Sequence, residues 1–150
     1  MRRTPPGCRI GVEPSKGLAS YQTRDGFWHQ LIDSPDTYQE TSATAVYICV
    51  IARAVNRGYV DARMYGPMAS LAWNAVASKV TARGQIEGVC VCVGTGMAFD
   101  PALHSCRPTS VEAAHCYGPT LLAGAEVIEI SKKFKFGRND SGWMYQGARP

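Results

Sequence analysis

Apolar residues recur along three stretches of the chain with the spacing of helices. The first runs from Thr41 to Arg57 and is apolar nearly all round, with polar residues confined to one narrow face. Such a pattern is typical of a deeply buried helix. Thr41 or Ser42 is suited to cap its first turn, and Gly58 is suited to end it in a left-handed conformation.

Two further helices follow from the same periodicity. The second covers Pro67 to Gly84, with the proline in its first turn, and the third covers Pro119 to Ser131. Just upstream of the third, Thr109 and Glu112 have the spacing of a capping box. The residues expected to face the core are Met68, Leu71, Ala72, Ala75, Val76 and Val80 in the second helix and Leu121, Leu122, Ala125, Val127 and Ile128 in the third.

The segments outside these helices show less regular spacing of apolar residues. Ile86 to Val93 alternates small and apolar residues, which indicates a short extended or β segment, and the glycines at Gly94 to Gly96 end it. These glycines lack the following Lys-Ser or Lys-Thr of a phosphate-binding loop. Residues 1–17 form an irregular leader, residues 18–131 hold the helical domain, and residues 132–150 form a polar tail. The predicted fold class is therefore all-α, with one short extended or β segment near residues 86–93.

Composition and charge exclude two classes of partner. The chain has 150 residues, of which 45% are hydrophobic and 19% charged, as expected of one globular domain. Its net charge of +4 comes from scattered basic residues, so nucleic acid is not an expected partner. The longest apolar run, Ala43 to Ala52, is too short to span a bilayer, and no membrane is expected. Since Thr4 to Cys8 lack the apolar core of an export signal, we expect a cytoplasmic protein with reduced cysteines.

Thiol and imidazole side chains cluster in the second half of the chain. Zinc prefers these ligands, but structural zinc sites usually contain a C-x-x-C pair, and this chain has C-x-C. Small buried hydrophobes are the commoner role of such cysteines, so neither a metal nor another cofactor is expected. A nucleophilic pair of cysteine with His104 or His115 is a further hypothesis. The residues concerned are Cys90, Cys92, His104, Cys106, His115 and Cys116.

The stretch Asp25 to Ala45 combines aromatic, acidic and hydroxyl side chains directly before the first helix. Trp28 and Tyr38 offer flat faces for a pyranose ring. Acceptors for sugar hydroxyls are Asp25, Gln30, Asp33, Asp36 and Glu40. The composition suits a sugar site, and it also suits an ordinary polar loop that leads into a helix.

Four ordered blocks together resemble the C-terminal half of glycoside hydrolase family 105, to which family 88 is similar. They are Asp25 to Ala45, GVCVCVGTG at Gly88 to Gly96, RPTSVEAAHCYGP at Arg107 to Pro119, and LLAGAEVI at Leu121 to Ile128. The resemblance covers roughly residues 18–131 and implies a partial (α/α)6 barrel with about half of the helical hairpins. Members are unsaturated rhamnogalacturonyl or glucuronyl hydrolases.

The resemblance also implies an unusual reaction. In the family, a carboxylic acid protonates the C4=C5 double bond of an unsaturated uronic acid and water adds at C5, without need of a metal. The catalytic aspartates of the family lie N-terminal to the part that this chain resembles, and Asp25, Asp33 and Asp36 match other positions. We therefore assign no catalytic residue and expect a truncated form that is inactive by itself.

The expected partner is an unsaturated uronyl oligosaccharide derived from pectin or rhamnogalacturonan. The residues expected to bind it are Trp28, His29, Gln30, Glu40, Arg107 and His115. This chain departs from the family pattern at two places, with an extra Cys-Val before Gly94 and with Cys116 in place of a glycine. A glycine after His115 would allow a closer approach of a ligand than Cys116 does, which weakens the case for His115.

Half a barrel leaves apolar helix faces uncovered, so self-association is a further expectation. Two alternatives to the enzyme remain. One is a non-catalytic carbohydrate-binding or assembly module, and the other is a Cys/His zinc-binding structural module.

Overall fold

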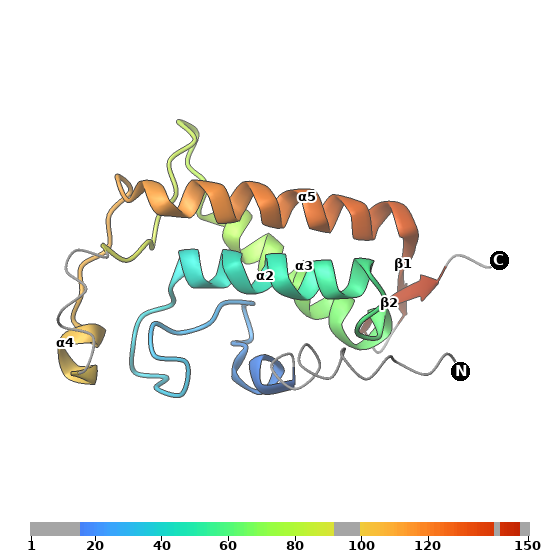
Figure 1. Ribbon diagram of the computed structural model, residues 1–150, viewed down its shortest axis with the longest axis horizontal. Helices are drawn as coiled ribbons and strands as arrows, with labels where there is room; N and C mark the ends of the chain where they lie inside the picture. The colour runs from blue at the N-terminus through green and yellow to red at the C-terminus, as the bar shows by residue number, and fades with distance from the viewer. Residues whose placement is uncertain (1–15, 92–99, 140–141, 148–150) are drawn as a thin grey trace.

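The computed structural model describes residues 16–91, 100–139 and 142–147. Three long helices dominate these ranges: α2 (Thr41–Asn56), α3 (Ala62–Ser78) and α5 (Tyr117–Lys133). In Figure 1, α2 and α5 lie side by side and run in the same direction, while α3 runs back behind them. The short helix α4 (Pro101–Ser105) and the 3-10 turn η3 (Ala114–Cys116) lie on the connection that leads into α5. The three predicted helices are thus confirmed, while their ends and faces differ in places.

Helix α2 begins and ends for identifiable reasons. Its N-cap is Glu40, whose carboxylate accepts a hydrogen bond from the backbone N–H of Ala43, and not Thr41 or Ser42 as the sequence suggested. Thr41 instead donates its hydroxyl to the carbonyl of Glu87, 2.7 Å away. Gly58 follows the helix with φ of +70°, so the predicted left-handed end is confirmed.

Helix α3 begins earlier than its proline suggested. Asp61 caps it by accepting from the N–H of Arg63 at 2.7 Å, and Pro67 lies inside the helix. A proline there removes one backbone hydrogen bond, which the packing of the flanking turns must offset. The helix ends at Ser78, while Gly84 lies in the following turn with φ of +79°. Met68, Ala72, Ala75 and Val76 are buried as predicted, whereas Leu71 and Val80 are exposed.

Helix α5 turns mostly a different face to the core from the one predicted, although Val127 does pack against the core as expected. Thr120, Ala123, Gly124 and Ile130 are buried, whereas Leu121, Leu122 and Ile128 are exposed. The predicted capping residues Thr109 and Glu112 both lie before its start, which has no side-chain cap. The small residues face inward because α3 approaches closely: a Cβ added at Gly124 would lie 2.8 Å from the ring of Trp73.

The core lies between the three helices. Its largest members are Trp28, Ile48, Ile51, Val76 and Ile130, all without solvent exposure. A second, smaller cluster of Ile86, Val89 and Cys116 lies where the connections meet. The loop before α2 thereby shares one core with the helices.

Two segments depart from the all-helical expectation. The predicted extended segment shows isolated bridges at Ile86 and Cys90, and its part from residue 92 onward lies outside the described residues. The polar tail contains two strands, β1 (Phe134–Asn139) and β2 (Gly142–Gly147), which pair antiparallel. Part of the leader is also ordered, since residues 16–21 are helical. Within the described ranges, every helix is too short or too polar to cross a bilayer.

Candidate functional site

The loop that precedes α2 is closed on itself like a small hairpin. An isolated bridge joins His29 to Gln39, the N–H of Gln30 donates to the carbonyl of Tyr38 at 2.8 Å, and Glu40 donates to the carbonyl of Trp28 at 2.9 Å. Both ends of the loop are therefore fixed beside the first turn of α2.

Two more segments attach to this loop. The N–H of Thr41 donates to the carbonyl of Gly88 at 2.9 Å, which ties residues 86–91 to the start of α2. Cys90 in turn forms a bridge with Thr109, and the N–H of Val91 donates to the carbonyl of Pro108 at 2.9 Å. Arg107 is thereby brought next to a loop that lies almost seventy residues earlier in the sequence.

Glu40 joins these segments through its carboxylate. Its side chain accepts from the hydroxyl of Ser42 at 2.9 Å, from the N–H of Ala43, and from the N–H of Cys90 at 2.9 Å. The residue is only 2% exposed. The sequence predicted Glu40 as a ligand for a sugar, but the structure uses its acceptors to hold the site together.

A groove of about 640 Å³ opens where the segments meet, and the basic side chains His29, Lys79 and Arg107 line it. The imidazole Nδ1 of His29 lies 2.5 Å from the carbonyl of Thr37, which leaves Nε2 for a ligand. The Nζ atom of Lys79 lies 5.8 Å from the ring centre of Phe27. The other lining residues are Thr37, Tyr38, Gln39, Gly88 and Thr109. Such a lining suits a ligand that carries hydroxyls and a negative charge.

Two of the predicted ligands, His29 and Arg107, therefore lie together, and Tyr38 lines the same groove. Lys79 was not predicted, because its position after α3 resembles any solvated helix end. His115 is exposed in η3 and is not among the residues that line the groove.

Trp28 does not offer its ring to a ligand in this structure. The indole is 0% exposed, its Nε1–H donates to the carbonyl of Leu18 at 2.8 Å, and it packs edge-to-face on Tyr47 at 5.3 Å between ring centres. A large aromatic side chain with its only donor satisfied inside the core has a packing role.

Gln30 contacts two of the side chains considered for zinc. Its Nε2 lies 3.4 Å from the Sγ atom of Cys90 and 3.0 Å from Nε2 of His104. In the ranges that the structure describes, no three cysteine, histidine or acidic side chains converge as metal ligands, and Cys92 lies outside those ranges. Burial raises the pKa of the Cys116 thiol, which disfavours the thiolate that a nucleophile or a zinc ligand requires.

One acidic residue of the loop, Asp25, has its pKa shifted away from the range of a general acid. A hydrogen bond from the hydroxyl of Thr23, assisted by the amide of Gln39, lowers the pKa of Asp25. A general acid requires the opposite shift. Asp33 and Asp36 are exposed at the tip of the loop. None of the described residues that line the groove carries a carboxyl group.

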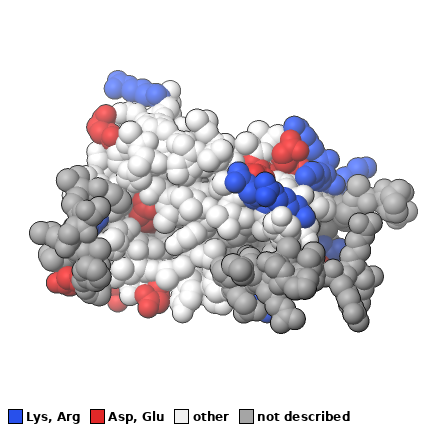
Figure 2. Space-filling view, viewed as in Figure 1, with Lys and Arg blue, Asp and Glu red and all other residues white. Residues whose placement is uncertain are grey.

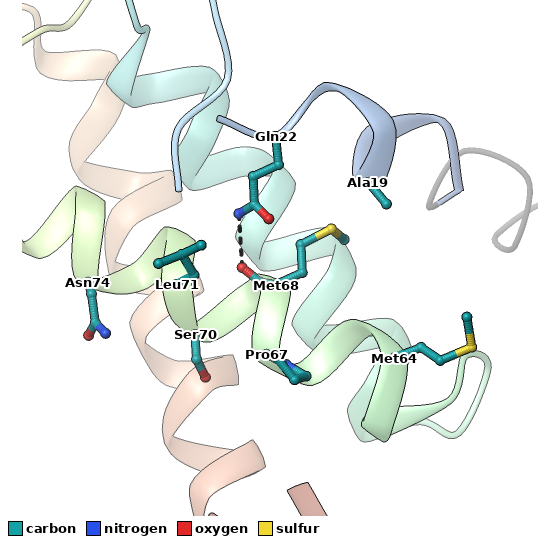
Figure 3. Close-up of a pocket in the computed structure, with 8 residues that line it drawn as sticks. All are labelled: Ala19, Gln22, Met64, Pro67, Met68, Ser70, Leu71 and Asn74. Carbon is teal, nitrogen blue, oxygen red and sulfur yellow. Dashed lines mark hydrogen bonds between the residues drawn. The ribbon is translucent and has the colours of Figure 1, made fainter. Parts of the chain in front are cut away.

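A second pocket of about 490 Å³ lies between residues 16–21 and α3 (Figure 3). Its walls are mostly apolar, with Met64, Met68 and Leu71 among them. The amide of Gln22 points to the backbone of α3 and donates to the carbonyl of Met68 at 3.1 Å. Because this pocket holds none of the predicted ligands, the groove is the candidate site.

Comparisons with known proteins agree on one group of enzymes. The model of Glycosyl Hydrolase Family 88 matches residues 12–131. An unsaturated 3S-rhamnoglycuronyl hydrolase from Formosa agariphila is 30% identical over 119 residues, which make up 77% of this chain and 29% of that protein.

Solved structures agree. A possible member of the GH105 family from Salmonella enterica superposes with a TM-score of 0.72 at 28% identity, over 79% of this chain and 30% of that one. A family 88 glycosyl hydrolase from Bacteroides vulgatus gives a TM-score of 0.64 at 24% identity, over 79% of this chain and 34% of that one, and supports the fold alone. The predicted resemblance and the partial (α/α)6 barrel are confirmed, and this chain spans about a third of the length of these relatives.

Proposed function

Because the chain belongs to glycosyl hydrolase family 88, we propose that its groove binds an unsaturated uronyl oligosaccharide. The observation that supports this is the convergence of His29, Lys79 and Arg107 on one groove. A uronic acid carries a carboxylate beside several hydroxyls. The planar guanidinium of Arg107 suits hydrogen bonds to the carboxylate of the uronic acid. His29 and the neighbouring hydroxyl side chains suit hydrogen bonds to the hydroxyls of the sugar ring.

The proposed ligands are thus His29, Gln30 and Arg107, with Lys79 added and His115 kept as a more distant candidate. Trp28 and Glu40 are buried and have structural roles: Trp28 packs in the core, and Glu40 forms hydrogen bonds that connect the segments around the groove. Pectin-derived rhamnogalacturonan fragments are the substrate class that the sequence predicted, and the Formosa agariphila relative is named for a rhamnoglycuronyl substrate.

The proposed reaction is hydration of the C4=C5 double bond. Protonation of that bond requires a carboxylic acid held near the ring, and none of the described residues supplies one at the groove. We therefore propose that the 150-residue chain binds the unsaturated uronide without consuming it. A truncated hydrolase and a non-catalytic carbohydrate-binding module would both bind the sugar without turnover. The test must therefore measure binding and turnover separately.

The test uses an unsaturated uronyl disaccharide, with its saturated neutral counterpart as the control ligand. We expect saturable binding of the unsaturated uronide by calorimetry, and no decrease in the ultraviolet absorbance of its double bond over time. Turnover by the purified chain would show that a proton donor has been overlooked. Absence of binding would contradict the proposal.

Arg107→Ala provides the matched variant. Loss of a charge-assisted hydrogen bond should weaken binding by about tenfold or more, while Arg83→Ala, which removes an exposed arginine of the turn between α3 and residue 86, should leave it unchanged. Equal effects of both substitutions would indicate nonspecific attraction to a basic surface and not a built site.

A further inference from the structure

Asp25 and Gln39 form a hydrogen-bonded pair at the edge of the groove. Nε2 of Gln39 lies 2.9 Å from each carboxylate oxygen of Asp25. Gln39 is among the residues that line the groove, whereas Asp25 is not. The bridge between Gln39 and His29 is antiparallel, and residues directly opposite each other in such a bridge have their side chains on the same face. The side chain of Gln39 therefore connects an exposed carboxylate to the groove.

The carboxylate determines which end of the Gln39 amide faces Asp25. An ionised carboxylate only accepts hydrogen bonds, so the amide must present its NH2 group and not its oxygen. A hydrogen bond from the hydroxyl of Thr23, 2.6 Å away, is the main cause that lowers the pKa of Asp25, and it keeps the carboxyl ionised at neutral pH. The amide oxygen of Gln39 is thereby turned away from Asp25.

A tight turn on α3 holds Asp25 in place. The N–H of Gly26 donates to the carbonyl of Thr23 at 3.0 Å, and the N–H of Thr23 donates to the carbonyl of Phe27 at 2.9 Å. Gly26 has φ of +102°, and a Cβ there would lie 2.7 Å from the carbonyl oxygen of Leu71 in α3. The turn approaches the backbone of α3 as closely as only a glycine allows. The position of Asp25 is therefore fixed by backbone contacts, although its side chain is exposed.

The amide oxygen of Gln39 supplies what the cationic side chains of the groove lack. Lys79 and Arg107 carry only hydrogen-bond donors, which suit a carboxylate. A sugar hydroxyl also carries a proton of its own, and that proton requires an acceptor. The oxygen of Gln39 can accept it, on the same side of the bridge as His29.

We propose that Gln39 is a specificity-determining residue of the groove, whose amide oxygen accepts a hydrogen bond from a sugar hydroxyl, and that Asp25 is the positioning residue that orients this amide. The inference rests on the proposed binding of an unsaturated uronide by the groove. It assigns two parts of that ligand to two different residues: the carboxylate to Arg107 and a hydroxyl to Gln39.

Asp25→Asn separates the orientation of the amide from the effect of charge. Asparagine has the same shape, but its amide can donate to Gln39 as well as accept from it, so the Gln39 amide is no longer held in one orientation. Figure 2 shows acidic side chains along the end of the molecule where the loop before α2 lies. Loss of one of these negative charges should by itself favour an anionic ligand. Weaker binding by Asp25→Asn would therefore come from the lost orientation and not from the charge.

Calorimetric titration with the unsaturated uronyl disaccharide measures these effects. We expect Gln39→Leu to weaken binding by about threefold to tenfold, as the loss of one hydrogen bond does, and Asp25→Asn to weaken it by about twofold or more. Because Asp25 acts through Gln39, the double variant should bind no more weakly than Gln39→Leu alone. Asp33→Asn, which removes another exposed carboxylate of the same loop, should not weaken binding. Matching far-ultraviolet circular dichroism would show that the variants fold.

Nuclear magnetic resonance observes the Gln39 amide without any ligand. The signals of its NH2 group, identified by their absence in Gln39→Leu, should shift in Asp25→Asn and stay in place in Asp33→Asn. Unchanged signals in Asp25→Asn would overturn the role of Asp25.

The failure of this inference and the failure of the proposed function give different results. If the unsubstituted chain does not bind the disaccharide, the proposed function fails and this inference fails with it. If the unsubstituted chain and Gln39→Leu bind it equally well, the proposed function stands and the role of Gln39 is overturned. Additive losses in Asp25→Asn and Gln39→Leu would show that the two residues act separately, which would overturn the positioning role of Asp25.

Discussion

Glu40 illustrates how one residue type fits two roles. A carboxylate just before an apolar helix suits a sugar hydroxyl and a helix cap equally well, and the sequence contains nothing that separates them. In the structure the carboxylate accepts from Ala43 at the helix start and from Cys90, a residue fifty positions away in the chain. The contact with Cys90 assigns Glu40 a structural role, because a buried carboxylate must accept its hydrogen bonds from donors within the protein.

Glu40→Ala should therefore destabilise the fold more than a lost cap alone. Removing the cap costs about 1 kcal/mol, and leaving the N–H of Cys90 buried without an acceptor adds about 1–3 kcal/mol. Urea unfolding would measure the difference in the free energy of unfolding. Glu112→Ala, an exposed acidic residue that accepts one hydrogen bond from Gln85, should change it by less than about 0.5 kcal/mol.

At the scale of elements, the chain specifies its helices more firmly than the faces they bury. Helix α5 is apolar on more than one side, so the bulky residues were predicted to face the core. The structure instead buries Ala123 and Gly124, because α3 approaches α5 closely at the ring of Trp73. Close approach of two helices favours small residues at the contact, and only the arrangement of the helices shows where that contact lies.

Two glycines of α5 test this packing. Gly124→Ala should destabilise the fold by about 1–3 kcal/mol, because the new Cβ would lie 2.8 Å from the ring of Trp73. Gly118→Ala has open space at the same helix and should stabilise it by up to about 1 kcal/mol through the lower entropy of the unfolded chain. Thermal unfolding of both variants measures the contrast, and equal shifts would show that α3 and α5 are not in close contact.

At the scale of the whole molecule, Glu126 of α5 links that helix to α2 through Arg53 and Asn56. Burial opposes ionisation of this carboxyl, but hydrogen bonds from Arg53 and Asn56 outweigh that effect and hold its pKa below the ordinary value of 4.5. A carboxyl whose pKa is lowered by folding stabilises the native state above its unfolded pKa. That contribution is lost as the pH falls through the folded value.

Glu126→Gln should thus be less stable than the unsubstituted chain at neutral pH, and the difference should disappear as the pH falls below the folded pKa of Glu126. Chemical unfolding at a series of pH values gives the comparison. Asp36→Asn, which removes an exposed carboxylate of the loop tip, should leave the pH profile unchanged. If the free energy of unfolding of Glu126→Gln differed from that of the unsubstituted chain by the same amount at all pH values, the ionised form of the Glu126 carboxylate would not be the source of the stabilisation.

By itself, the sequence determined the helices and the family. Periodic apolar residues predicted α2, α3 and α5, because local spacing is enough to form an amphipathic or buried helix. The four ordered blocks identified the relatives, and His29 and Arg107 were among the expected ligands. The β1–β2 pair was missed because each strand has six residues and includes glycine, so the alternation of Phe134, Lys135 and Phe136 is too short a pattern to indicate a strand.

Only the tertiary structure decided which side chains line the groove. It buried Trp28, turned Glu40 into a tether, and brought Lys79 to the groove from the end of α3. It also left the large apolar residues of α5 exposed. Each of these outcomes depends on contacts between segments far apart in the chain, and such contacts follow from how the helices pack and not from the residue types within any one segment.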